Sequence, residues 1–146
     1  MSLTEEVFDF VIGADGIRSF LRTETFPNAK IRYDLPTPVF GKGRILLLGD
    51  AAHATTPNMG QGAGTAVEDA WILSGLFSSL TDKEDVLPAL IRRRLKRVAR
   101  ITKLSYLFGK LAHVRSPGWV HLRNHFVSMI PDAVNKRQMQ KFLLKY

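Results

Sequence analysis

One stretch of the sequence, residues 45–73, constrains the fold more than any other. It opens with four consecutive apolar residues, Ile45 to Leu48, which are too few for a helix and predict a strand buried on both faces. Gly49-Asp50 ends that strand, a glycine-rich loop follows, and a helical pattern begins at residues 61–62. In open α/β sheets, ligands bind outside the carboxyl ends of the strands. The order of strand, acidic residue, glycine loop and helix therefore predicts an α/β fold with a ligand site beside Asp50.

The residues of this stretch have the chemistry of a cofactor site. The Asp50 carboxylate can accept hydrogen bonds from the hydroxyl groups of a sugar or polyol. Gly60, Gly62 and Gly64 carry no side chain where a planar or anionic group must approach the backbone. The first turn of the helix directs free N–H groups and the positive end of its dipole toward such a group. The same residues also suit a tight turn whose glycines serve packing alone, so both interpretations stay open on these features.

The run GDAAHATTPNMGQGAGTAVEDAWIL resembles the second FAD-binding motif of flavoprotein monooxygenases of the p-hydroxybenzoate hydroxylase type. In that family the motif reads Gly-Asp-Ala-Ala-His, then Pro, then Gly-Gln-Gly, then an acidic-Asp-Ala pair on the following helix. The resemblance implies that Asp50 binds the ribityl chain of FAD and that residues 57–64 lie against the isoalloxazine ring. The cofactor-binding residues implied by this motif are Gly49, Asp50, Pro57, Gly60, Gln61, Gly62, Ala63 and Gly64.

A second segment, GADGIRSFLR, follows a strand predicted at residues 8–12. Taken alone, Asp-Gly after an apolar run also suits a hairpin turn. The segment resembles the other motif of the same family, Gly-Ala-Asp-Gly followed by Ser and Arg. This implies that Asp15 lies near FAD and the path of the nicotinamide-cofactor pyrophosphate, with Ser19 and Arg22 supporting the loop. The resemblance also implies that the two predicted strands lie side by side and parallel.

Two parts of the family's pattern are missing from this sequence. Residues 23–44, where family members normally carry a substrate-binding sheet, predict only a short strand at Lys30–Tyr33 and turns elsewhere. The Gly-x-Gly-x-x-Gly unit, which holds the ADP half of FAD in the family, is also absent. Without that unit, one edge of the strand at residues 8–12 would carry unpaired N–H and C=O groups. The expected outcome is self-association, an exchange of elements, or cover from the chain's own N-terminal residues.

The region from residue 83 onward predicts three helices. Apolar residues recur at three- and four-residue steps from Leu87 to Leu111, and Ser116-Pro117-Gly118 ends this first helix. A second helix is predicted over Trp119–Met129, and a third from Pro131 to Tyr146. With the strands above, these helices predict a partial, Rossmann-like FAD-binding domain with a small, mainly parallel sheet followed by three C-terminal helices.

The charge is divided unevenly along the chain, whose net formal charge is +8. Residues 83–146 carry 15 Lys/Arg and 3 Asp/Glu, whereas residues 1–82 carry 6 and 10. The basic helices could contact the phosphates of nucleic acid or an anionic membrane, but no nucleic-acid motif accompanies them, and a solvated face is the favoured interpretation. His121 and His125 stand at i and i+4 with no carboxylate or cysteine near, which disfavours a metal site.

These features predict a single domain, with residues 1–82 as its partial FAD-binding part and residues 83–146 as its basic helical part. No cysteine is present and no segment is long enough to span a bilayer, which is typical of a cytoplasmic protein. The first functional hypothesis is an FAD-dependent monooxygenase that uses NADH or NADPH to hydroxylate a small organic substrate, represented by a shortened chain. No side chain stands out as a catalytic acid, base or nucleophile, which suits chemistry carried out by a cofactor. The second hypothesis is a non-catalytic remnant that acts as an interaction module through its basic helices.

Overall fold

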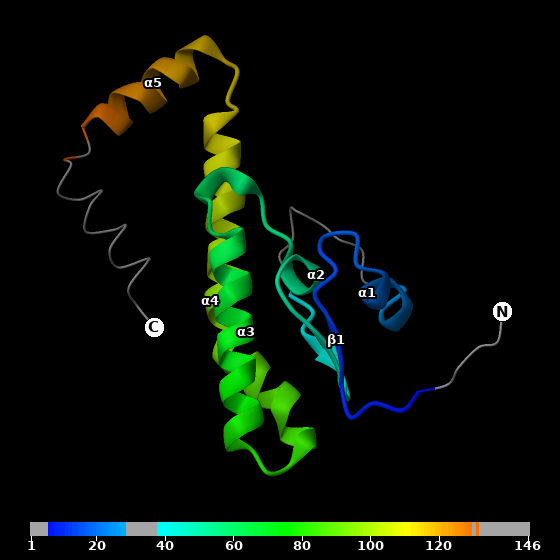
Figure 1. Ribbon diagram of the computed structural model, residues 1–146. Helices are drawn as coiled ribbons and strands as arrows, with labels where there is room; N and C mark the ends of the chain where they lie inside the picture. Colours follow the sequence, from blue (N-terminus) through cyan, green and yellow to red (C-terminus); the bar gives the residue numbers. More distant parts are fainter. Residues whose placement is uncertain (1–5, 29–37, 130, 132–146) are drawn as a thin grey trace. The chain divides into compact units, whose positions relative to one another are not determined.

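A computed structural model describes residues 6–28, 38–129 and 131 (Figure 1). They form two compact units, residues 1–109 and 110–146, whose boundary falls within the longest helix. The strands are β1 (Val11–Gly13), β2 (Gly41–Lys42) and β3 (Ile45–Leu47), and the helices are α1 (Phe20–Thr25), α2 (Asp50–His53), α3 (Gly62–Ser79), α4 (Val86–Ala112) and α5 (Pro117–Ser128), with 3-10 turns at Pro57–Met59 and Lys83–Asp85.

The sheet of the first unit has the order β1-β3-β2. β1 pairs with β3 in parallel, with Val11 opposite Ile45, as the sequence predicted. The central position of β3 explains its unbroken apolar run, because Leu46 and Leu47 are completely buried. The strand predicted at residues 8–12 was placed too early: only the residues from Val11 to Gly13 find pairing partners on β3.

β2 was missed by the sequence analysis, which assigned turns to this region. It pairs antiparallel with β3, with Gly41 opposite Leu46. Gly41 has φ +144° and a Cβ on it would lie 2.1 Å from the Ile45 carbonyl oxygen, so only glycine allows this close hairpin. Gly41, in a region expected to form turns, therefore allows the two strands to come together. The strand expected at Lys30–Tyr33 lies outside the described residues.

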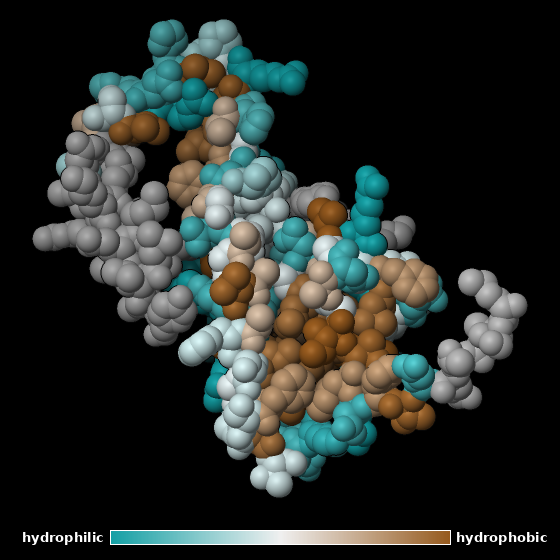
Figure 2. All heavy atoms as spheres, in the orientation of Figure 1, coloured by the Kyte–Doolittle hydropathy of each residue, from teal (hydrophilic) through white to brown (hydrophobic). Residues whose placement is uncertain are grey.

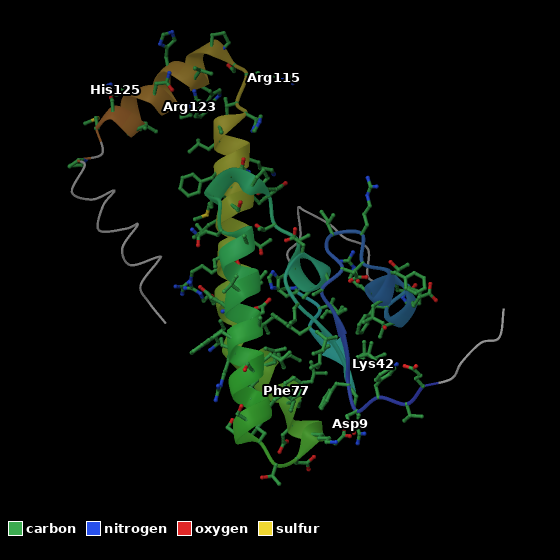
Figure 3. All side chains as sticks on the ribbon, in the orientation of Figure 1. Asp9, Lys42, Phe77, Arg115, Arg123 and His125 are labelled. Carbon is green, nitrogen blue, oxygen red and sulfur yellow. The ribbon has the colours of Figure 1, made fainter. Side chains whose placement is uncertain are left out.

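Helices α3 and α4 run side by side and form a core with β3 (Figure 1). Leu73 and Leu76 of α3 and Leu90 and Val98 of α4 pack in one cluster with the leucines of β3. At the far end of α3, Phe77 packs edge-on against Phe10 with ring centroids 4.9 Å apart (Figure 3). This contact holds the segment before β1 against the C-terminal end of α3.

The second unit contains the end of α4 and the whole of α5. The predicted second helix is confirmed, but the break before it comes earlier than expected: α4 ends at Ala112, and α5 begins at Pro117, so Pro117 and Gly118 form its first turn. Arg123 of α5 donates hydrogen bonds to the carbonyl oxygens of Leu111 (3.2 Å) and Ala112 (3.0 Å), which are among the last carbonyls of α4 and lack partners within that helix (Figure 3). The third helix predicted from Pro131 to Tyr146 falls on residues that are not described. Among the described residues, no helix combines the length and hydropathy that a bilayer span needs.

Candidate functional site

The Asp50 carboxylate lies beside the first turn of α3. Gly49 has φ +56° and a Cβ on it would lie 2.9 Å from the Cβ of Ala66, so glycine is needed where β3 meets α3. This turn makes Asp50 the first residue of α2, a short helix that the sequence analysis did not predict, and leaves its side chain exposed. Asp50 Oδ1 lies 4.0 Å from the position that a Cβ would take on Gly62. The structure thus brings Asp50 and the glycine-rich helix start together.

The first turn of α3 is open. The helix begins at Gly62, as the sequence predicted, and Gln61 makes no capping hydrogen bond with its side chain. The first N–H groups of an α-helix have no partner within the helix. A Cβ would meet nothing within 4 Å on Gly60, whose φ is +62°, or on Gly64. Ala63 is exposed between them, so small groups line the approach to these N–H donors.

One buried polar atom beside this turn has no partner. Thr55 Oγ1 is buried and makes no hydrogen bond, and it is the single such side-chain atom found among the described residues. The Thr55 methyl carbon lies 3.6 Å from the position of a Cβ on Gly62. Buried hydroxyl groups in proteins are almost always hydrogen-bonded. Thr55 thus packs its methyl group against the start of α3, and its buried hydroxyl is left without a partner among the described residues.

The loop before α3 makes a tight turn. Pro57 opens the 3-10 turn, and the Gly60 N–H donates to the Pro57 carbonyl oxygen at 3.0 Å. Pro57, Asn58 and Gly60 are all exposed. The turn ends at Gly60, whose positive φ favours glycine.

Asp15 is engaged by α1. Its Oδ2 accepts hydrogen bonds from the N–H groups of Phe20 (2.7 Å) and Leu21 (3.3 Å). The Ser19 hydroxyl lowers the pKa of Asp15 most, and the backbone N–H groups of Leu21 and Phe20 lower it further. The carboxylate stabilises the start of α1. Among the interactions of the described residues, none joins Asp15 to the group formed by Asp50 and α3.

Arg22 joins the two motif loops. Its side chain is buried and donates hydrogen bonds to the carbonyl oxygens of Ile17 (2.6 Å), Asp50 (3.3 Å) and Ala51 (2.8 Å). Ser19, also buried, caps α1 by accepting a hydrogen bond from the Arg22 N–H at 3.0 Å. The supporting role that the family resemblance implied for Ser19 and Arg22 agrees with these contacts. Arg22 fixes the turn that carries Asp50 relative to β1 and α1.

Asp69 is the centre of a buried ionic network that the sequence analysis missed. Its Oδ2 accepts a hydrogen bond from the Gly49 N–H at 3.0 Å and lies 2.5 Å from His53 Nε2, and its Oδ1 accepts one from Arg94 Nε at 2.6 Å. Burial raises the pKa of Asp69, but its hydrogen bond and electrostatic interaction with His53, together with Gly49 and Arg94, outweigh burial and hold the pKa below its ordinary value.

The two arginines of this network were misassigned to the solvated face of the basic helix. Arg94 is almost completely buried and donates to Glu68 Oε2 (2.7 Å) and the Thr65 carbonyl oxygen (3.1 Å). Arg97 binds both oxygens of Glu68, at 2.7 and 2.6 Å. The signal available in the sequence was Glu68-Asp69 on an apolar helix, since two buried carboxylates require cations nearby. The network connects α2, α3, α4 and the end of β3.

The remaining candidates do not form a site. Within the part of the chain that the structure describes, no three His, Cys, Asp or Glu side chains come close enough together to hold a metal ion. His121 and His125 lie on α5, where the His125 ring contacts the Phe126 ring edge-on with centroids 6.3 Å apart. The best-formed site in the first unit is therefore the one at Asp50 and the start of α3.

Comparison with known proteins agrees with the sequence motif at residues 49–73. Residues 36–105 match the family model of the FAD binding domain. The 2-heptyl-3-hydroxy-4(1H)-quinolone synthase of Pseudomonas aeruginosa is 42% identical over 100 residues, which cover 68% of this chain and 26% of that enzyme. A salicylate hydroxylase of Pseudomonas putida is 32% identical over 117 residues, covering 77% and 27%. The crystal structure of Klebsiella pneumoniae HpxO with FAD and uric acid matches with a TM-score of 0.68 and 26% identity, covering 75% of this chain and 28% of HpxO.

Residues 36–105 therefore belong to the FAD binding domain family, and the chain is similar to the part of these relatives that it covers. This confirms the family resemblance and the partial Rossmann-like fold that the sequence predicted. The chain spans about a quarter of the length of the curated relatives it matches.

Proposed function

We propose that this chain binds the flavin end of FAD as part of an FAD-dependent monooxygenase, which hydroxylates a small organic substrate at the expense of NADH or NADPH. The observation that carries the proposal is the position of the Asp50 carboxylate, 4.0 Å from the Cβ-free face of Gly62 at the open start of α3.

Each residue of the proposed site has its own role in binding the flavin. Asp50 accepts hydrogen bonds from the ribityl hydroxyls, and the N–H groups from Gly62 to Gly64 with the helix dipole stabilise negative charge on the flavin ring. Pro57, Gly60, Gln61 and Ala63 contribute backbone and small side chains to the wall that the ring lies against, while Gly49 sets the turn that presents Asp50.

The role of Asp15 in cofactor binding is proposed from its sequence motif alone. We place it near FAD and the pyrophosphate of the nicotinamide cofactor, while its contacts with Phe20 and Leu21 keep the carboxylate oriented. When bound, FAD supplies the redox chemistry, accepting hydride from NADH or NADPH and activating O₂. The protein's own part is to bind, orient and stabilise charge, and no residue is proposed as catalytic. The cytoplasmic location expected from the cysteine-free sequence stays a prediction.

Flavin titration of the purified chain tests the proposal. Binding of FAD and of FMN is measured by quenching of flavin fluorescence for the native chain, for Asp50→Asn, and for Asp85→Asn, which changes an exposed carboxylate away from the site. Losing a hydrogen bond to a charged group costs about 1.5–3 kcal/mol, so the Kd of Asp50→Asn should rise by about tenfold or more while that of Asp85→Asn stays unchanged. FMN should bind about as well as FAD, because the site holds the flavin end. A native chain that takes up neither flavin, or an Asp50→Asn chain that binds as the native chain does, would contradict the proposal.

A second proposal concerns self-association through β1. β1 is at the edge of the described sheet, and its Val11 and Ile12 side chains are nearly half exposed. Val7, Phe8 and Phe20 are also exposed in the first unit, and Figure 2 shows apolar side chains gathered over part of its surface. An unpaired apolar strand edge favours pairing with another chain. Light scattering after size exclusion should show a dimer that Ile12→Lys dissociates; a native chain that stays monomeric at about 100 μM, far above typical self-association constants, would contradict this.

A further inference from the structure

A polar cluster ties the loop before α3 to the far part of α4. Ser105 of α4 is completely buried and donates its hydroxyl to the Thr56 carbonyl oxygen at 2.6 Å, and the hydroxyls of Thr56 and Ser105 lie 2.7 Å apart. The Asn58 side-chain amide bridges the two segments, donating to Thr56 Oγ1 (3.0 Å) and to the Ser105 carbonyl oxygen (3.0 Å). The loop and helix are 47 residues apart in sequence at this contact.

The absence of a side chain at Gly109 makes room for the Asn58 amide. A Cβ on Gly109 would lie 2.3 Å from Asn58 Nδ2 and 3.2 Å from Asn58 Cγ, so any side chain at position 109 must displace the Asn58 amide. The displaced atoms are the end of an exposed side chain, so the backbone of α4 need not move. Gly75 is also within a helix, but a Cβ on it would meet nothing within 4 Å. Glycine weakens a helix interior, and only at position 109 does a close contact explain its presence.

We propose that Asn58, Ser105 and Gly109 form a latch through which α4 positions the flavin-binding loop. The inference rests on the proposed function of Asp50 and the start of α3. Asn58 lies within the 3-10 turn that leads to α3, only four residues before Gly62. Gly60 and Gly64 leave the backbone of this segment free to take many conformations. The hydrogen bonds of Asn58 restrict it to one, so Ser105 and Gly109 are positioning residues that act through the loop.

Four variants of the full chain test the latch: Asn58→Ala, Gly109→Ala, their double variant, and Gly75→Ala as the matched glycine control. Two neutral hydrogen bonds are lost in each single variant, so the Kd for FAD should rise by about five- to tenfold. Because both changes remove the same bridge, the double variant should bind no more weakly than the weaker single one. Gly75→Ala should bind FAD as the native chain does. Unchanged affinity in both single variants, or effects that multiply in the double variant, would overturn the latch.

Hydrogen–deuterium exchange of the ligand-free chain separates the latch from the proposed function. Backbone amides of residues 57–64 should exchange about fivefold faster or more in Asn58→Ala and Gly109→Ala than in the native chain. In the same two variants the amides of β3 should keep their native exchange rates. In Gly75→Ala the amides of residues 57–64 should also keep their native rates. If the native chain binds no FAD, the proposed function fails, and faster exchange confined to this loop still supports the latch. Unchanged loop exchange overturns it, and Asn58→Ala decides the matter if Gly109→Ala fails to fold.

Discussion

Two regions of the first unit, both built on the segment from Gly49 to Asp69, differ in whether their polar groups have partners within the chain. Around Asp69 every charged group has a partner inside the chain: Gly49, His53 and Arg94 bind its carboxylate, and Glu68 binds Arg94 in turn. Asp50, which follows Gly49 directly in the chain, is instead exposed, and the Thr55 hydroxyl in the same segment is buried without a partner.

The difference separates what holds the fold from what is available to a ligand. Buried charges are tolerated only when they are paired, so the Asp69 network is complete without any other molecule. It joins the end of β3 to α3 and α4, and the turn that bears Asp50 is attached to it through Gly49. Removing a partner from the network should therefore harm stability, whereas changes around Asp50 should harm binding and leave stability almost intact.

Arg94→Met should have the largest effect of all. The change leaves Asp69 and Glu68 without their shared cation in a buried setting, and breaking a buried ion pair from one side costs about 3–5 kcal/mol of unfolding free energy. Arg93→Met, on the exposed face of the same helix, should change it by less than about 0.5 kcal/mol. Urea denaturation of the ligand-free chains measures both. Equal stabilities for the two variants would remove the distinction between the regions.

Acid should weaken the same network. The pKa values of Asp69 and Glu68 are both lowered by folding, since hydrogen bonds with His53, Arg94 and Arg97 outweigh the effect of burial. A group whose pKa is lower in the folded state stabilises the protein above its unfolded pKa, and this stabilisation is lost as the pH falls through the folded value. The unfolding free energy should thus fall below about pH 4.5, near the ordinary values of both carboxyls.

Urea denaturation between pH 2.5 and 6 measures this acid effect. In Glu68→Gln the loss below the ordinary carboxyl range should be smaller than in the native chain, because one of the two titrating groups is gone. A native chain whose unfolding free energy rises as the pH falls from 5 to 3 would contradict the assignment.

Thr55→Val should stabilise the ligand-free chain. The hydroxyl is buried without a partner, so replacing it with a methyl group removes a desolvation penalty of about 1 kcal/mol. Thr102→Val is the matched control, because its buried hydroxyl donates to the Val98 carbonyl oxygen at 3.0 Å and its loss should destabilise by about 1 kcal/mol. Thermal unfolding gives the sign in each case, and a destabilised Thr55→Val chain would show that the hydroxyl has a partner in solution.

The sequence predicted the open region better than the buried one, for physical reasons. The strand at Ile45–Leu47 and the start of α3 have strong local signals: an apolar run, a turn glycine and a helical period. β2 depends on the close approach of Gly41 to Ile45, which is a contact between backbones and leaves no pattern in the sequence.

The buried network was hidden for a different reason. Arg94 stands within an Arg-Arg-Arg run, and periodicity cannot distinguish an arginine that binds two buried carboxylates on a neighbouring helix from its exposed neighbours. The pairing partners are 25 and 26 residues away and depend on how α3 packs on α4. The positions of charged residues on a helix were predictable from the sequence, but their burial was not.

Asp50→Asn should have the smallest effect on stability and so defines the comparison most sharply. Its side chain is exposed, and substitutions at exposed positions change the unfolding free energy by less than about 0.5 kcal/mol. If the same variant loses flavin affinity by about tenfold or more, Asp50 contributes to ligand binding and hardly at all to folding. A stability loss of more than about 1 kcal/mol, measured by urea denaturation without ligand, would instead make Asp50 part of the buried network's support for the turn. The two regions would then be one structural unit, because the carboxylate at the helix start would serve the fold as Asp69 does.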